Sequence, residues 1–120
     1  MKKIFVVDDN TSNLLVAEEV LSTQYEVYTL SSAAFMFNLL NNIVPDLILL
    51  DLLMPEIDGF DVLKQLKGDE RYADIPVVIL TSKGDAATEA LGLETGAVDF
   101  IRKPFSRPVL LDRMLLHLHE

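Results

Sequence analysis

The chain has 120 residues, half of them apolar, with a formal net charge of -9 and a pI near 4.5. This length suits one domain with one well-filled core, so we expect a single domain over residues 1–120. The negative charge argues against a broad surface for nucleic acid or anionic membrane, because both of these partners are polyanions. The sequence contains no cysteine, which excludes disulfides, thiol catalysis and Cys-based zinc sites.

The first residues carry two lysines, as a signal peptide does, but the apolar run that follows them is short. It comprises Ile4 to Val7 and ends at Asp8 and Asp9, so we interpret it as a strand. No stretch approaches the roughly 18 to 20 apolar residues that a membrane span needs. We therefore expect a cytoplasmic protein that does not bind membrane.

Short apolar runs alternate with segments of helical periodicity along the chain. The runs that predict strands are residues 4–7, 26–30, 47–51, 77–80 and 98–102. The segments that predict helices begin near residues 12, 32, 60, 86 and 108, and the second extends to about Ile43. Unbroken alternation of strands and helices predicts an α/β fold, with a parallel sheet and helices on both faces.

Polar residues stand where four of these helices would begin, and each can cap a helix amino terminus. The candidate caps are Thr11 or Ser12, Ser31 or Ser32, Asp85, and Ser106 or Arg107. Apolar residues at helical spacing predict the buried faces of the first three helices. These are Leu14, Ala17, Val20 and Leu21; Phe35, Leu39 and Leu40; and Phe60, Leu63 and Leu66. Gly96 is placed to end the fourth helix.

Charged or polar side chains follow the ends of four predicted strands. They are Asp8 and Asp9, Asp51, Thr81, and Lys103. The carboxyl ends of parallel strands meet at one edge of a sheet, where open α/β sheets bind their ligands. Three carboxylates brought together repel one another unless a cation holds them. Oxygen ligands of this kind suit Mg²⁺ together with a phosphoryl group.

Asp51 is the central candidate, because it ends a strand that is otherwise apolar, Leu47 to Leu50. Its carboxylate can act as a nucleophile toward a phosphoryl donor and form an aspartyl phosphate. Mg²⁺ and the Lys103 ammonium would neutralise charge, and the Thr81 hydroxyl would donate a hydrogen bond to a phosphoryl oxygen. Neither His117 nor His119 falls near these strand ends, so we expect slow hydrolysis of the acyl phosphate.

Taken in order, these motifs resemble the receiver domain of two-component response regulators over the whole chain. They are Asp8-Asp9, Asp51 with Met54-Pro55 and Asp58-Gly59, Thr81, and Lys103-Pro104-Phe105. The resemblance implies a flavodoxin-like (βα)5 fold whose five-stranded parallel sheet has the order 2-1-3-4-5. It implies phosphoryl transfer to Asp51 from a sensor histidine kinase or a histidine phosphotransfer protein. Such a signalling domain catalyses its own phosphorylation and slow dephosphorylation and is not a turnover enzyme.

The resemblance also implies a metal site and a backbone feature. Mg²⁺ would be held by Asp9, Asp51 and the backbone carbonyl of Leu53, with Asp8 assisting. The peptide bond between Lys103 and Pro104 would be cis, which proline makes accessible.

A switch and its tuning residues follow from the same resemblance. When the phosphoryl group draws Thr81 inward, Phe100 would rotate into the vacated space. The surface of the fourth helix, fifth strand and fifth helix would then change, controlling a downstream effector domain or protein, or a homodimer. Leu53, Ser82 and Lys83 occupy positions beside the phosphoryl group that tune its lifetime, and an apolar Leu53 should hinder attack by water.

Three other functions are compatible with parts of the pattern. A nucleotide or flavin site would want free backbone amides after the first strand, where two aspartates stand instead. A phosphatase with an aspartyl nucleophile would want an Asp-x-Asp arrangement, but Leu53 occupies the place of the second acid. A degenerate receiver would bind partners without phosphorylation, yet all five strand-end residues of the motif are present.

Overall fold

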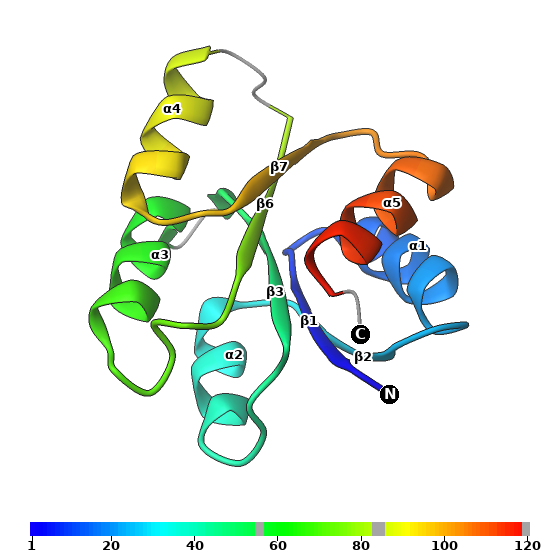
Figure 1. Ribbon diagram of the computed structural model, residues 1–120, viewed down its shortest axis with the longest axis horizontal. Coiled ribbons are helices and arrows are strands. Elements are labelled where there is room, and N and C mark those ends of the chain that lie inside the picture. The colour runs from blue at the N-terminus through cyan, green and yellow to red at the C-terminus, as the bar shows by residue number, and fades with distance from the viewer. Residues whose placement is uncertain (55–56, 83–85, 119–120) are drawn as a thin grey trace.

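The computed structural model describes residues 1–54, 57–82 and 86–118 (Figure 1). Within these ranges, five parallel strands form one sheet in the spatial order β2-β1-β3-β6-β7. The strands are β1 (Lys3–Val7), β2 (Glu26–Leu30), β3 (Leu47–Asp51), β6 (Val77–Thr81) and β7 (Asp99–Arg102). Because β6 and β7 are the fourth and fifth strands of this sheet along the chain, the predicted flavodoxin-like order 2-1-3-4-5 is confirmed. The last strand begins at Asp99, one residue later than predicted.

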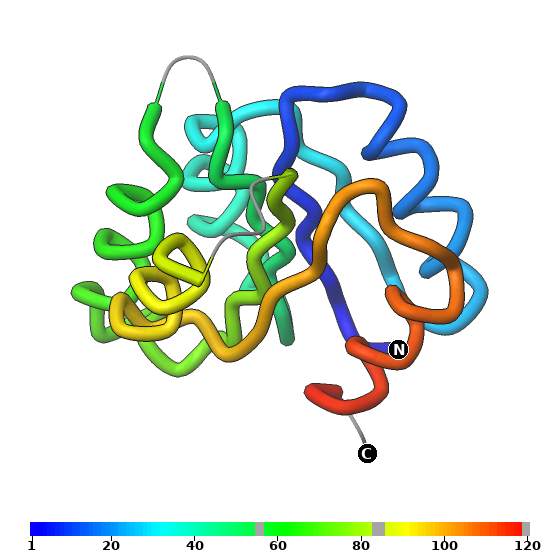
Figure 2. Tube along the Cα trace, turned by 90° about the horizontal axis from the view of Figure 1, so that it is seen from above, coloured from blue at the N-terminus to red at the C-terminus, as the bar shows by residue number. Residues whose placement is uncertain are grey.

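Helices cover both faces of the sheet. They are α1 (Thr11–Leu21), α2 (Ala33–Leu40), α3 (Gly59–Gly68), α4 (Ala86–Thr95) and α5 (Arg107–His117). Helices α1 and α5 lie on one face, and α2, α3 and α4 lie on the other, in both views (Figures 1 and 2). Along β1, Ile4 and Val6 enter the core with α1 and α5, whereas Phe5 and Val7 enter the core with α2 and α3. None of the helices that the structure describes has the length and apolar character to cross a membrane.

A short antiparallel ribbon, which the sequence did not predict, follows the third strand. It pairs β4 (Leu53–Met54) with β5 (Ile57–Asp58). Asp58 then caps α3, because its Oδ1 accepts a hydrogen bond from the Phe60 N–H at 2.8 Å. The ribbon therefore joins the strand that ends in Asp51 to the start of α3. Pro55 of the sequence motif lies outside the described residues.

The capping residues predicted from the sequence are confirmed for two helices and wrong for a third. Ser32 caps α2 and Ser106 caps α5, each from the predicted pairs. The prediction for α1 was wrong: Asn10 is the cap, and its Oδ1 accepts from the Asn13 N–H at 3.1 Å, instead of Thr11 or Ser12. Gly96 follows α4 with φ of 123°, the backbone region that glycine occupies freely, as predicted. The candidate cap Asp85 lies outside the described residues.

Helix α2 differs most from its prediction. It ends at Leu40 instead of near Ile43 and buries Ala33, Met36 and Leu40. Phe35, expected inside, is 58% exposed. At about 100° per residue, positions 33, 36 and 40 share one side of the helix, and residue 35 points well away from them. The bulk of the phenylalanine misled the prediction, because small Ala33 occupies the inward position. In α1, by contrast, the predicted buried face is confirmed: Leu14, Ala17, Val20 and Leu21.

Candidate functional site

Three buried polar side chains gather at the carboxyl edge of the sheet. Asp8 follows β1, Asp51 ends β3 and Thr81 ends β6, and their exposed fractions are 0%, 2% and 1%. Among the residues that the structure describes, these are the buried polar or charged ones. Lys103 follows β7, and its backbone N–H donates to the Thr81 carbonyl at 2.9 Å. The parallel sheet thus brings the predicted strand-end residues to one edge.

The Lys103 ammonium lies between two of these carboxylates. Its Nζ is 2.7 Å from Asp8 Oδ2 and 3.3 Å from Asp51 Oδ1. The lysine side chain is only 15% exposed, and both carboxylates are more deeply buried. Charges removed from water in this way interact strongly, because the low dielectric of the interior screens them little. Lys103 is therefore a fixed cation of the site.

Asp8 is held by two residues that the sequence reasoning missed. The Asn10 N–H donates to Asp8 Oδ1 at 2.9 Å, and Asn13 Nδ2 donates to Asp8 Oδ2 at 3.2 Å. Asn10 is also the cap of α1. The available signal for the first bond was Asp8 itself, because an Asp side chain commonly accepts a hydrogen bond from the backbone N–H two residues on.

Asp51 carries opposing influences on its charge. Its Oδ1 accepts a hydrogen bond from the Leu53 N–H at 3.1 Å. Burial raises the pKa of the Asp51 carboxyl, and the nearby Asp8 carboxylate adds to the rise, while the Leu53 N–H and the Lys103 ammonium lower it in part. The net pKa lies above the ordinary value. A cation that joined this site would therefore stabilise the ionised form of Asp51.

The acidic residues of the site fit a hard divalent cation. Asp8, Asp9 and Asp51 each offer one carboxylate oxygen, and these oxygens all lie within 4.8 Å of one another. Asp9 is exposed, whereas the other two are buried. Carboxylate oxygens, with one side open to water, are the ligands that Mg²⁺ prefers. One lysine does not neutralise three carboxylates, which leaves charge for a cation to balance.

Residues 4–115 match the family model described as the response regulator receiver domain. The chain belongs to this family. Among its curated relatives is a probable cyclic di-GMP phosphodiesterase of Vibrio cholerae, 37% identical over 117 residues, or 98% of this chain and 26% of that protein. The DNA-binding dual master transcriptional regulator RpaA of Synechocystis is 36% identical over 95% of this chain and 48% of that protein. This receiver therefore spans less than half of either relative.

Solved structures show the same fold. The chemotaxis protein CheY4 of Vibrio cholerae superposes with a TM-score of 0.92 and 27% sequence identity, covering 98% of this chain and 99% of that one. The flavodoxin-like fold predicted from the motifs is thus confirmed both within this receiver and by likeness to a known one.

The structure also describes most of the other residues that the resemblance singled out. The Lys103-Pro104 peptide is cis, as the resemblance implied. Leu53 has a 46% exposed side chain, and Ser82, directly after Thr81, is also exposed. Phe100 is partly buried and pairs in register with Ile79 of β6. Lys83 lies outside the described residues.

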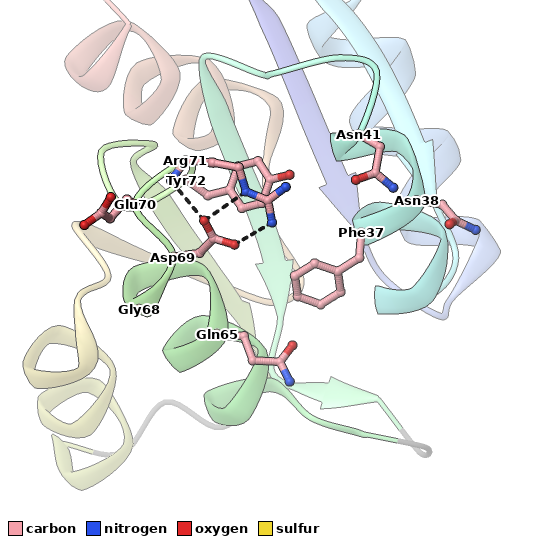
Figure 3. A pocket seen from close by; sticks show the side chains of 9 residues that line it. All are labelled: Phe37, Asn38, Asn41, Gln65, Gly68, Asp69, Glu70, Arg71 and Tyr72. Carbon is pink, nitrogen blue, oxygen red and sulfur yellow. Dashed lines mark hydrogen bonds and ion pairs between the residues drawn. The ribbon is translucent and has the colours of Figure 1, made fainter.

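A cavity of about 830 Å³ lies away from this site (Figure 3). It is bordered by the end of α2 and by the segment that follows α3, including Asn41 and Tyr72. Helices α2 and α3 follow strands that end at Asp8's edge, so their last residues lie at the opposite edge of the sheet. Arg71 in its wall donates two hydrogen bonds to Asp69, at 3.1 and 2.8 Å, and lies 4.8 Å from the centroid of the Tyr72 ring. The exposed Arg71 guanidinium is therefore already paired with Asp69, as the dashed lines show (Figure 3).

The start of β7 is bonded to α5 through one carboxylate. Asp99 Oδ1 accepts from Arg113 Nη1 at 2.5 Å, and Asp99 Oδ2 lies 2.9 Å from His117 Nε2. Burial alone would raise the pKa of Asp99, but the hydrogen bonds from Arg113, His117 and the Phe100 N–H, together with the Arg113 charge, outweigh it and hold the pKa below its ordinary value. The ionised carboxylate therefore fastens α5 to the sheet.

We expect Asp99→Asn to lower the free energy of unfolding at neutral pH by about 1 kcal/mol, the upper end of the range for a partly exposed ion pair. A carboxyl whose pKa is depressed on folding stabilises the protein above its unfolded pKa and loses this contribution as pH falls through its folded pKa. The difference between wild type and variant should therefore shrink from about pH 4 downward. Urea denaturation across this range measures it, with exposed Asp112→Asn on the same helix as the control. An equal difference at all pH values would contradict the assignment.

Proposed function

We propose that Asp51 is the phosphoacceptor of this receiver domain. It accepts a phosphoryl group from a phosphohistidine of a sensor histidine kinase or a histidine phosphotransfer protein. The observation that carries the proposal is the buried Asp51 carboxylate at the sheet edge, with the Lys103 ammonium 3.3 Å from one oxygen and two more aspartates beside it. Buried charges of both signs at an edge of the sheet suit a ligand that is itself charged, such as a phosphoryl group.

In the transfer step, an Asp51 carboxylate oxygen forms a bond to phosphorus as the phosphorus–nitrogen bond of the donor breaks. The electron pair of that bond stays with the imidazole nitrogen, and the imidazole leaves as neutral histidine because its other ring nitrogen already carries a proton. Lys103 neutralises charge that develops on the phosphoryl oxygens, and the Thr81 hydroxyl donates a hydrogen bond to one of them. Asn10 and Asn13 hold Asp8 in place beside the reaction.

The donor set described above supports a Mg²⁺ ion held by Asp9, Asp51 and the Leu53 carbonyl, with Asp8 assisting. When bound, Mg²⁺ neutralises charge on the oxygens of the transferring group. The aspartyl phosphate is then slow to hydrolyse, because His117 of α5 is bonded to Asp99 at the start of β7 and the apolar Leu53 side chain is exposed beside the site. Ser82 and Lys83 tune the same lifetime from the end of β6.

Phosphorylation is proposed to reach partners through Thr81 and Phe100. As the phosphoryl group draws Thr81 inward, Phe100 moves toward the vacated space, and the surface of α4, β7 and α5 changes its packing. That surface then controls an output domain, a separate effector protein or a second copy of the chain. Of the two curated relatives described above, one is named as a probable phosphodiesterase and the other as a transcriptional regulator, and this receiver covers only 26% and 48% of their lengths.

The decisive test is phosphorylation by a small donor. Incubated with acetyl phosphate and Mg²⁺, the wild-type chain should gain one phosphoryl group by intact mass, and Asp51→Asn should gain none. The matched control is Asp46→Asn, which lies at the other end of the same strand and whose side chain can still accept from the Lys3 N–H. Chelation of Mg²⁺ should suppress the adduct. A folded wild-type chain without any adduct, or an adduct retained in Asp51→Asn, would contradict the proposal.

A further inference from the structure

Helix α4 meets the sheet through a glycine. Gly92 is the buried residue of α4, and every residue of this helix is described. A Cβ atom placed on Gly92 would lie 2.6 Å from Phe100 Cζ, 3.3 Å from Phe100 Cε1 and 2.8 Å from Ile79 Cδ1. Separations below 3.0 Å are not tolerated between carbon atoms, so no larger residue fits without displacement. The tip of the Phe100 ring therefore packs directly against the backbone of α4.

This contact lies beside the phosphoacceptor edge. Phe100 of β7 pairs in register with Ile79 of β6, so both side chains project from the same face of the sheet. Thr81 is two residues beyond Ile79 along the same strand and therefore also belongs to that face. Two features therefore lie along one row under α4. One is the space at Gly92 that the tip of the Phe100 ring fills, and the other is the buried Thr81 side chain.

We propose that Gly92 is a positioning residue of the switch, because its missing side chain seats the Phe100 ring and makes the position of α4 depend on that ring. The inference rests on the proposed function and deepens it by naming the contact that moves the helix. When Phe100 leaves this seat toward Thr81, it vacates the space below the α4 backbone, and the helix shifts to close the gap. Packed protein interiors do not keep an empty space as large as the tip of a phenyl ring without rearrangement.

An ion pair that also joins α4 to β7 permits such a shift. Arg102 Nη2 lies 2.7 Å from Glu89 Oε1, and the Arg102 side chain is 64% exposed. Exposed ion pairs contribute little to stability and re-form readily after a small displacement. The ion pair therefore does not hold α4 against a change in the position of the Phe100 ring.

The test compares phosphorylated and unphosphorylated chains by amide NMR. In the wild type, phosphorylation should shift the resonances of α4. Gly92→Ala should still accept one phosphoryl group at Asp51, but the shifts in α4 should be lost, because the added methyl group keeps the ring out of its seat in both states. Gly68→Ala is the matched control, since a Cβ there meets nothing within 4 Å, and it should respond like the wild type.

Two further variants separate steric exclusion from a general folding defect. Phe100→Leu keeps Gly92 but removes the ring tip, so its α4 shifts should also be lost. In a Phe100→Ala background, adding Gly92→Ala should shift the unphosphorylated α4 resonances beyond residue 92 less than it does in the wild-type background, because the clash with the ring is gone and only the contact with Ile79 Cδ1 is left. Phosphorylated Gly92→Ala or Phe100→Leu with wild-type shifts in α4 would overturn the inference. A missing wild-type adduct would instead count against the proposed function.

Discussion

Replacing Lys103 by methionine is expected to lower the free energy of unfolding by about 3 kcal/mol when divalent cations are chelated. The reason is the pair of buried carboxylates that the ammonium joins, at 2.7 Å to Asp8 and 3.3 Å to Asp51. Without Lys103, two like charges face each other in a site that water barely reaches. Methionine has a similar length, so the lost charge, and not a cavity, should dominate the change. Urea denaturation in EDTA gives the value.

The same variant should be phosphorylated about a hundredfold more slowly by acetyl phosphate, the scale of losing one group that stabilises charge in a transition state. Lys64→Met, an exposed lysine of α3, is the control and should change neither quantity appreciably. The double variant Lys103→Met with Asp8→Asn should recover part of the stability, because one unpaired charge is gone, yet it should not recover the rate. If stability and rate returned together, Lys103 would act only through folding.

The strand-end site could be predicted because it depends on features that short stretches of sequence carry. Apolar runs locate the strands, and a parallel sheet forces their carboxyl ends together, so Asp8, Asp51, Thr81 and Lys103 had to meet at one edge. The direct bonds from Lys103 to both aspartates follow from this geometry. The side chains of α1 were placed correctly for a similar reason, because its apolar period repeats over three turns.

The features that were missed depend on contacts between distant segments or on one-residue choices. Asn10 is the cap in place of Thr11 or Ser12, and its backbone N–H also donates to Asp8, a contact that no pattern within the helix indicates. Phe35 was placed inside on hydrophobicity alone, although an eight-residue helix has room for few inward positions. From the sequence, Gly92 is only a residue that weakens a helix, whereas in the structure it leaves room for the Phe100 ring of β7. Helix propensity predicts neither this contact nor the one between Asn10 and Asp8.

The Gly59→Ala variant should be destabilised by about 3 kcal/mol, although alanine is the better helix former. A Cβ on Gly59 would lie 2.5 Å from Leu52 Cα and 2.9 Å from the Leu52 carbonyl oxygen. These are backbone atoms of a residue that is itself hydrogen-bonded in the structure, since the Leu52 N–H donates to the Leu80 carbonyl and the Leu52 carbonyl accepts from the Gly59 N–H. No side-chain rotation can relieve such an overlap, so the chain between Asp51 and α3 must move.

Because Leu52 directly follows Asp51, that movement should reach the phosphoacceptor as well as the core. We expect slower phosphorylation by acetyl phosphate in Gly59→Ala even under conditions where the variant is fully folded, since the Asp51 carboxylate loses its set position beside Lys103. Gly68→Ala at the other end of the same helix meets nothing within 4 Å and should instead gain up to about 1 kcal/mol. Comparing their urea midpoints and phosphorylation rates separates crowding from helix propensity. Equal stability in the two variants would mean that the β3–α3 connection yields to a methyl group, and Gly59 would then have no part in positioning Asp51.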